Sequence, residues 1–299
     1  MTRRFALSVT VLMTGFASIA SAQGWGQERS IDQLTEHVYR WGADGQNGML
    51  VVTPEGAIVA DGHYCDRGHV PWLKSQIDSR FGVPVKFVVL SHDHQSHICE
   101  TEVFADTAVA IGHRNILPHL VREGRRALVP AITFEESLDI NLGGVKVVLI
   151  YMGPLHSDNL IQVHVPEEGV LFAPDFARGT NIFPDFRDMD VDNMLDAQLT
   201  AAYMPNVEMV IPGHGDLKTQ DNFLVYRRYL ESIRQQVLDH MVAGRTLEQI
   251  YGLVTMEEFR GEYNISDQSL RNNIDSMYDY LYRYREPNDP AGLPVRAVN

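Results

Sequence analysis

The chain has 299 residues, 44% of them hydrophobic, and carries a formal net charge of -14 at pH 7. A chain of this length can bury one large core or two modest ones. Its acidic balance leaves no basic surface for phosphate, so we expect no nucleic-acid partner.

The first 22 residues resemble an export signal. Arg3 and Arg4 supply a positive start, Phe5–Ile19 are mostly apolar, and Ala20–Ala22 form a small-residue cleavage site. We therefore predict a signal peptide over residues 1–22 and a periplasmic or secreted mature protein, with Sec and Tat export as alternatives. The apolar run is too short to span a membrane comfortably and no later run is long enough, so we expect no membrane span.

After the signal, the pattern predicts an antiparallel meander followed by alternating strands and helices. Short apolar runs between Glu36 and Ala60 indicate the strands of the meander, with Thr53–Gly56 as a hairpin turn. A helical pattern covers residues 66–81, and an apolar run indicates a buried strand at 85–90. Further strands are predicted at 109–111, 145–150, 160–165, 170–172 and 207–211, with a helix at 191–204.

From residue 219 onward the chain is predicted to be mostly helical. Apolar residues recur at helical spacing in the segments 223–241, 247–253 and 270–282. Residues 285–299 are rich in proline and charge and are predicted to form a loose tail. We therefore divide the mature chain into a catalytic domain at 23–218 and a helical C-terminal extension at 219–299, which could supply a homodimer contact.

Three of the 12 histidines lie within six residues, directly after the strand predicted at 85–90. The segment reads Leu90-Ser91-His92-Asp93-His94-Gln95-Ser96-His97. Two histidines separated by one residue can point the same way from an extended loop, and a third can turn inward as a helix begins. Amphipathic spacing does not explain this cluster, which therefore predicts a metal site.

Three more candidate ligands lie at the ends of predicted strands. His156 occupies a turn-rich stretch between two strands, Asp175 ends an apolar strand, and His214 follows the strand at 207–211. Because each candidate lies where a strand gives way to a loop, we expect all of them to converge on one edge of the sheets.

These motifs resemble those of the metallo-β-lactamase superfamily, which includes glyoxalase II, lactonases and the class B β-lactamases. Their order and spacing are similar from about Glu36 to Asp216, over most of the mature chain. The resemblance implies an α/β fold, an αββα sandwich of two mixed β-sheets flanked by helices, with the active site on one edge. It also implies a metal-dependent hydrolase with a small-molecule substrate.

Carried over by position, the resemblance implies two metal positions. The first metal would be bound by His92, His94 and His156. The second would be bound by His97 and His214, with Asp175 bridging the two metals as in glyoxalase II. An acid at the bridging position favours esterase-like members over the β-lactamases, which usually lack one there.

The chain departs from the family motif H-x-H-x-D-H at Ser96, which stands where the motif has its acid. That acid normally binds the second metal and helps to orient the attacking water or to protonate the leaving group. A neutral hydroxyl is a poor zinc ligand, so affinity for the second metal should fall and Asp175 or a metal-bound water would have to move the proton. The alternative interpretation of Ser96 is a helix N-cap.

This departure leaves three outcomes open: one tightly held zinc, a cysteine thiolate at the second metal, or loss of hydrolysis. For Cys99 we favour a structural role, either buried or disulfide-bonded to Cys65, over a ligand role, because free cysteine is mostly buried and the predicted compartment is oxidising. Asp61 resembles the family's acidic turn below the site and is assigned a structural role. His63 and His69 either border the site or lie at the surface.

We predict a hydrolase in which one or two zinc ions supply hydroxide for attack on an ester, thioester, lactone or amide carbonyl. The rival from another class is an iron-dependent oxidoreductase similar to persulfide dioxygenases. In that case His92, His156 and Asp175 would form the two-His-one-carboxylate face of a non-haem iron site, although export argues against it. A metal-binding protein without catalysis ranks last, because it would have no evident need for six site residues.

Overall fold

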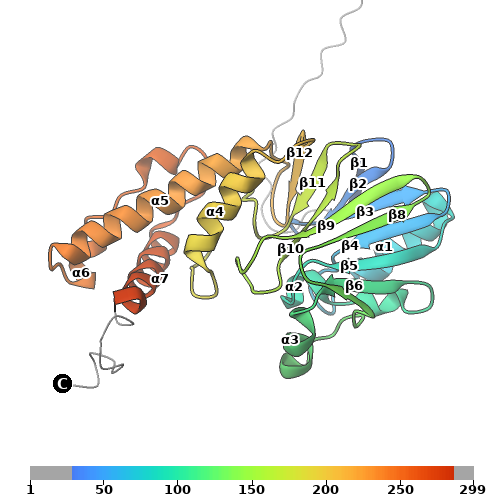
Figure 1. Ribbon diagram of the computed structural model, residues 1–299, viewed down its shortest axis with the longest axis horizontal. Helices are drawn as coiled ribbons and strands as arrows, with labels where there is room; N and C mark the ends of the chain where they lie inside the picture. The colour runs from blue at the N-terminus through green and yellow to red at the C-terminus, as the bar shows by residue number, and fades with distance from the viewer. Residues whose placement is uncertain (1–28, 286–299) are drawn as a thin grey trace, which may run out of the picture.

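The computed structural model describes residues 29–285. The signal peptide predicted at 1–22 lies outside these residues, and so does all but the first residue of the tail predicted at 285–299. Two mixed β-sheets pack face to face with helices on both outer sides, and further helices extend from one end (Figure 1). The prediction of an αββα sandwich with C-terminal helices is confirmed.

The first sheet has seven strands that lie side by side in chain order. They are β1 (Ser30–Gln33), β2 (Val38–Ala43), β3 (Gln46–Thr53), β4 (Gly56–Ala60), β5 (Val85–Leu90), β6 (Val109–His113) and β7 (Ile132–Phe134). β1 to β4 are antiparallel, and β2 to β4 form the predicted meander, whereas β4 to β7 are parallel. The parallel half requires crossover segments, and one of them carries the histidine cluster after β5.

The second sheet has five strands in the order β12-β11-β10-β9-β8. They are β8 (Ser137–Leu142), β9 (Val145–Tyr151), β10 (Ile161–Val165), β11 (Val170–Ala173) and β12 (Met209–Pro212). All neighbours are antiparallel except β11 and β12, which are parallel. The carboxyl ends of β11 and β12 therefore lie at the same edge, where Asp175 and His214 follow them.

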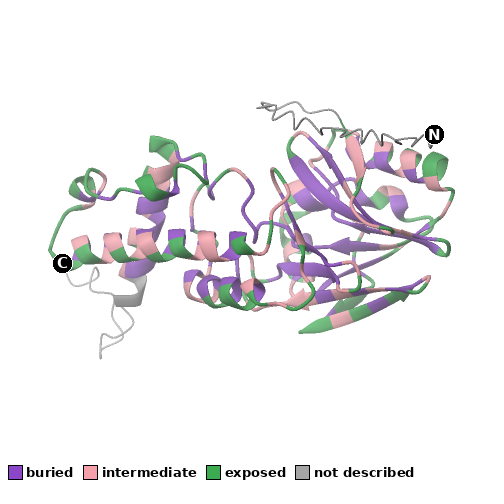
Figure 2. Ribbon diagram, turned by 90° about the horizontal axis from the view of Figure 1, so that it is seen from above, coloured by how far each residue is buried: buried purple, intermediate pink, exposed green. Residues whose placement is uncertain are grey.

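Two apolar layers hold the sandwich together. Met49 and Val89 of the first sheet pack between the sheets with Phe172 and Ile211 of the second. The outer face of the first sheet is covered by α1 (His69–Gln76), α2 (Gln95–Ile98) and α3 (Ile116–Glu123). Most strand residues are buried as a result, as Figure 2 shows. Burial of this apolar surface is the main force that fixes the strand ends carrying the candidate ligands.

The remaining helices cover the second sheet and extend beyond it. They are α4 (Val191–Ala202), α5 (Asp221–Val242), α6 (Leu247–Ile250) and α7 (Asp267–Arg285). Residues of α5 that recur every three or four positions, such as Tyr226, Leu230 and Ile233, are buried in one core with α4, α7 and residues 155–210. The proposed division at residue 219 stays a prediction, but α5 and α7 share this core with the segment that follows Asp175.

None of the helices within residues 29–285 is long and apolar enough to span a membrane.

Several short elements were not predicted from the sequence. β1 and β7 have only 4 and 3 residues, too few for a clear period. The helix α3 was not predicted either. It contains Pro118, which lies in the first turn of the helix, where its missing N–H is tolerated. β8 carries alternating apolar residues at Leu138, Ile140 and Leu142, a two-residue period that could have identified it.

Candidate metal centre

Two groups of side chains with metal-ligand chemistry meet at the edge of the sandwich. His92, His94, His156 and Asp175 form one group, and His97, Asp175 and His214 form the other. Within each group the candidate ligand atoms all lie within 4.8 Å of one another. The structure therefore brings together all six residues that the sequence singled out, while their assignment as ligands stays a prediction.

Asp175 lies at the centre of both groups. Its Oδ2 is 3.5 Å from His92 Nε2, 3.3 Å from His97 Nε2 and 3.5 Å from His156 Nε2. Its Oδ1 is 3.5 Å from His214 Nε2. One carboxylate thus faces imidazoles from both groups, which is the arrangement expected of a bridging ligand.

Two aspartates reach their positions through unusual backbone conformations. Asp61 follows β4 with φ of 66°, and Asp175 follows β11 with φ of 46°. Aspartate is among the few residues with a side chain that tolerate this left-handed region. Each conformation turns the chain sharply after a buried strand, which is consistent with local strain at a functional site.

Asp61 is in neither group of candidate ligands but supports two of them, in keeping with the structural role assigned to it from the sequence. Its Oδ2 lies 2.8 Å from His97 Nδ1 and accepts a hydrogen bond from Ser91 Oγ at 2.8 Å. Its Oδ1 accepts the Ser91 backbone N–H at 2.8 Å. Ser91 Oγ also lies 2.9 Å from His92 Nδ1. Asp61 and Ser91 therefore fix the ring orientations of His92 and His97, so that both Nε2 atoms face Asp175.

The loop that carries His214 lies so close to the segment after Asp175 that one position requires glycine. A Cβ at Gly179 would overlap the His214 carbonyl oxygen. Asn47 of β3 holds the same loop, because its Nδ2 donates to the Pro212 and Gly215 carbonyl oxygens at 2.9 and 2.7 Å. These contacts place His214 opposite Asp175 without any contribution from its own side chain.

The electrostatics of the site keep most imidazoles neutral. Burial lowers the pKa of His156 and His214 to about 4, and it also lowers the pKa of His92 and His94. Burial alone would lower the pKa of His97 too, but the carboxylates of Asp175 and Asp61 outweigh it and raise that pKa to about 10. Neutral imidazoles are the form that binds a metal ion.

The unpaired atoms of the site fit a metal ion. The Nε2 atoms of His92 and His97 are buried and have no hydrogen-bond partner among the described residues. Buried polar atoms are rarely left unsatisfied in a native protein. Imidazole nitrogens with a carboxylate oxygen are the donor set that zinc accepts. The residues present therefore fit a zinc site, with His92 and His97 in two different groups that share Asp175.

Ser96 takes no part in either group of candidate ligands within residues 29–285. It is the second residue of α2, which begins at Gln95, so the interpretation of Ser96 as the helix N-cap is wrong; His94 occupies that position. The Ser96 carbonyl oxygen accepts a hydrogen bond from Gln46 Nε2. An N-cap at Ser96 would start the helix at His97, but α2 begins two residues earlier, at Gln95.

The two cysteines form a disulfide, Cys65–Cys99, with 5.0 Å between their Cα atoms. Bonded sulfurs are not thiolates, so this structure offers no cysteine ligand within the described residues. His63 is buried with Nε2 2.9 Å from the Ala43 carbonyl oxygen, and His69 Nε2 lies 2.9 Å from Asp44 Oδ2. Neither histidine joins the candidate ligands.

Sequence reasoning missed two residues beside the site. The Arg178 guanidinium is buried, with Nη1 3.7 Å from Asp175 Oδ1. The Phe183 ring is stacked on His156, with centroids 4.9 Å apart. Arg178 lies three residues after Asp175, a spacing that could have drawn attention to it. No sequence signal links Phe183 to His156.

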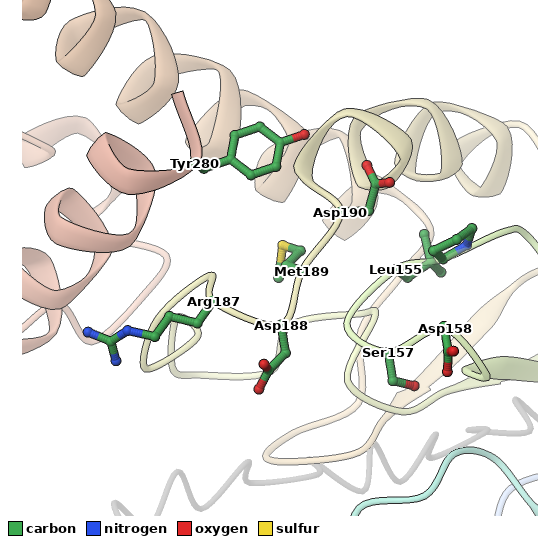
Figure 3. A pocket seen from close by; sticks show the side chains of 9 residues that line it. Leu155, Ser157, Asp158, Arg187, Asp188, Met189, Asp190 and Tyr280 are labelled. Carbon is green, nitrogen blue, oxygen red and sulfur yellow. The ribbon is translucent and has the colours of Figure 1, made fainter. Parts of the chain in front are cut away.

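A cavity of about 310 Å³ lies beside the loop of His156, since Leu155 and Ser157 line it. Asp188 and Asp190 contribute carboxylates to its wall, and Tyr280 reaches it from α7 (Figure 3). None of the six candidate ligands lines this cavity.

The chain is similar in sequence to a known protein family and to named relatives. A family model described as the Metallo-beta-lactamase superfamily matches residues 41–214. The chain is 26% identical over 205 residues to a metallo-beta-lactamase type 2 from Bacteroides fragilis, which covers 62% of this chain and 79% of that protein. It is 31% identical over 167 residues to the beta subunit of 2,4-dinitroanisole O-demethylase from Nocardioides sp., which covers 54% of this chain and 52% of that subunit. The chain thus spans about half the length of the second relative.

Solved structures share the fold. A metallo-beta-lactamase from Pontibacter korlensis superposes with a TM-score of 0.61 at 20% identity, covering 68% of this chain and 99% of that one. A mono-zinc metallo-beta-lactamase from Pseudomonas aeruginosa gives a TM-score of 0.60 at 18% identity, covering 70% and 98%. At these identities the likeness shows the fold alone.

Proposed function

The chain belongs to the metallo-beta-lactamase superfamily, and on that basis we propose that it is a zinc-dependent hydrolase of small-molecule esters, thioesters, lactones or amides. The observation that carries this proposal is the position of Asp175 between two sets of imidazoles, two of which have buried Nε2 atoms without a hydrogen-bond partner in residues 29–285.

In this proposal His92, His94 and His156 hold one zinc ion, and His97 and His214 face a second position across Asp175. A bound zinc ion would lower the pKa of its water to about 7 and polarise the substrate carbonyl. Ser96 contributes no carboxylate, so we infer that the second position is the weaker one. The protein would then bind the first zinc ion more tightly than the second.

Asp175 is the carboxylate that could accept a hydrogen bond from the attacking water. Burial alone would raise its pKa, but His97 and His214 hold that pKa well below its usual range. Asp175 is therefore ionised at neutral pH and can accept a hydrogen bond from the attacking water at Oδ1 or Oδ2, which orients that water. The Arg178 guanidinium nearby balances the charge of this carboxylate.

We propose only the chemical class of the substrate, a carbonyl compound that is an ester, a thioester, a lactone or an amide. The Bacteroides relative is named for β-lactam hydrolysis, and a β-lactam is a cyclic amide. The bridging acid, Asp175, favours esters and lactones instead. A panel of all four carbonyl classes therefore decides between them.

The test compares the wild type with His156→Ala on that panel, after both proteins are loaded with zinc. We expect hydrolysis of at least one class by the wild type and its loss in the variant. Hydrolysis that survives in His156→Ala, or none on the whole panel with zinc fully bound, would refute the proposal. Oxygen uptake by an iron-loaded protein would instead support the oxidoreductase.

We also propose export to the periplasm or the exterior. The sequence pattern of residues 1–22 and the disulfide between Cys65 and Cys99 both support an oxidising compartment. Fractionation of cells that express the full chain tests it, and recovery of an uncleaved protein in the cytoplasm would contradict it.

A further inference from the structure

The rings of His92 and His97 have polar neighbours, whereas the ring of His156 is stacked on an aromatic side chain. Asp61 and Ser91 contact the Nδ1 atoms of those two rings. For His156 the described residues supply no such contact at Nδ1; its Nε2 lies 3.0 Å from His94 Nδ1. What lies against the His156 ring is Phe183, stacked with an interplanar angle of 29°.

Phe183 is itself held firmly. Its side chain is 2% exposed, and the Arg178 guanidinium carbon lies 3.8 Å from its ring centroid. The ring of Tyr226 in α5 lies 5.8 Å away. Since a buried ring in such contacts has little freedom, its position depends on where the backbone of Phe183 is fixed.

That backbone is fixed by the C-terminal helix α7. The Asn273 side chain is 0% exposed, and its Nδ2 donates to the Phe183 carbonyl oxygen at 2.8 Å. Its Oδ1 accepts the Tyr229 hydroxyl of α5 at 2.8 Å. Ser276, three residues later on α7, holds a different point of the chain, since its Oγ accepts the backbone N–H of Phe186 at 2.9 Å. A buried amide whose donor and acceptor are both satisfied specifies one geometry, because any other would leave a polar group unpaired.

We propose that Asn273 is a positioning residue for the candidate metal ligand His156, acting through Phe183. The C-terminal helices are then part of the construction of the site. This inference rests on the proposed function for its effect on zinc, but the geometry that it describes exists without a metal.

The experiment uses Asn273→Ala, with Tyr229→Phe as a milder variant and Ser276→Ala as the matched control. Ser276→Ala removes a buried hydrogen bond from the same helix to the same segment, but at Phe186 instead of Phe183. Two readouts are compared in each full-length protein. The first is the imidazole NMR signal of His156 in the metal-free protein, and the second is zinc affinity from chelator competition.

Asn273→Ala should shift the His156 ring signals, because ring-current shifts depend on the stacked Phe183, and leave those of His63, whose ring contacts are Trp41, Tyr64 and His69, in place. It should weaken zinc binding by about 10-fold, a typical effect of changes behind a metal ligand. Tyr229→Phe should shift the same signals by less, and Ser276→Ala should change neither readout. If Asn273→Ala does not fold, Tyr229→Phe alone carries the comparison.

Unmoved His156 signals in Asn273→Ala or Tyr229→Phe, or equal effects from Ser276→Ala, would overturn the inference. The two proposals fail separately. If the wild type bound no zinc but Asn273→Ala still shifted the His156 signals, the proposed function would fall and the positioning role would stand.

Discussion

The Asp61 carboxylate lies 2.8 Å from His97 Nδ1, and His97 Nε2 lies 3.3 Å from Asp175 Oδ2. The imidazole of His97 thus stands between two buried carboxylates from different sheets. Asp61 follows β4 of the first sheet, and Asp175 follows β11 of the second. These contacts join the two halves of the sandwich at the candidate metal centre.

Removing the Asp61 carboxylate should weaken the second metal position. In Asp61→Asn, the amide no longer supplies the negative charge that orients and polarises His97. We expect zinc affinity at that position to fall by about 10- to 100-fold. Asp139→Asn, which removes an exposed carboxylate paired with Lys146, serves as the control. Equal affinities for Asp61→Asn and the control, measured by chelator competition, would show that Asp61 has no such role.

Restoring an acid at position 96 should strengthen the second position. Ser96→Asp supplies the carboxylate that the family motif has there, and carboxylate oxygen is a far better zinc ligand than a hydroxyl. We expect the second zinc to bind more tightly than in the wild type, while Ser96→Ala should resemble the wild type. Titration of metal-free protein with zinc gives both affinities. An unchanged second affinity in Ser96→Asp would mean that Ser96 does not limit metal binding.

The disulfide should stabilise the fold without holding metal. Cys65 and Cys99 are 34 residues apart, and a cross-link of that span typically contributes about 2–4 kcal/mol to the free energy of unfolding. The double variant Cys65→Ser, Cys99→Ser should lose stability of that order in denaturant titrations and keep its zinc content. A drop in zinc content in the folded variant would revive the cysteine-ligand alternative.

Acid should destabilise the protein through the buried His63. Burial lowers its pKa from 6.5 to about 4. Between pH 6.5 and 4 the unfolded chain therefore binds a proton that the folded state does not, so stability falls as the pH falls through this window. Wild type should lose up to about 3 kcal/mol more than His63→Gln between pH 7 and pH 4. Parallel pH curves for the two proteins, from denaturant titrations, would contradict this assignment.

The sequence was sufficient for the fold and for the convergence of the candidate ligands. The meander, the strand before His92 and the strands before Asp175 and His214 carry clear hydrophobic patterns, and ligands that follow strand ends meet at a sheet edge. Short strands such as β1 and β7 were not predicted, because they have too few residues to show a hydrophobic period.

The supporting residues of the site could not be foreseen in the same way. Phe183 and Asn273 are 90 residues apart, and their contact depends on how α7 packs in the shared core. The interpretation of Ser96 as a helix cap failed for a local reason, since the boundary of a four-residue helix is not encoded by one polar side chain.

The most direct test of the candidate metal centre is the zinc content of the purified wild type, measured by mass spectrometry beside His92→Ala. His92 is fully buried, and its Nε2, which has no hydrogen-bond partner in the part of the chain that the structure describes, faces Asp175. We predict about one zinc per chain or more in the wild type and a loss of most of it in a folded His92→Ala variant. Equal zinc in both proteins, or none in the wild type after exposure to zinc, would contradict the proposed metal centre.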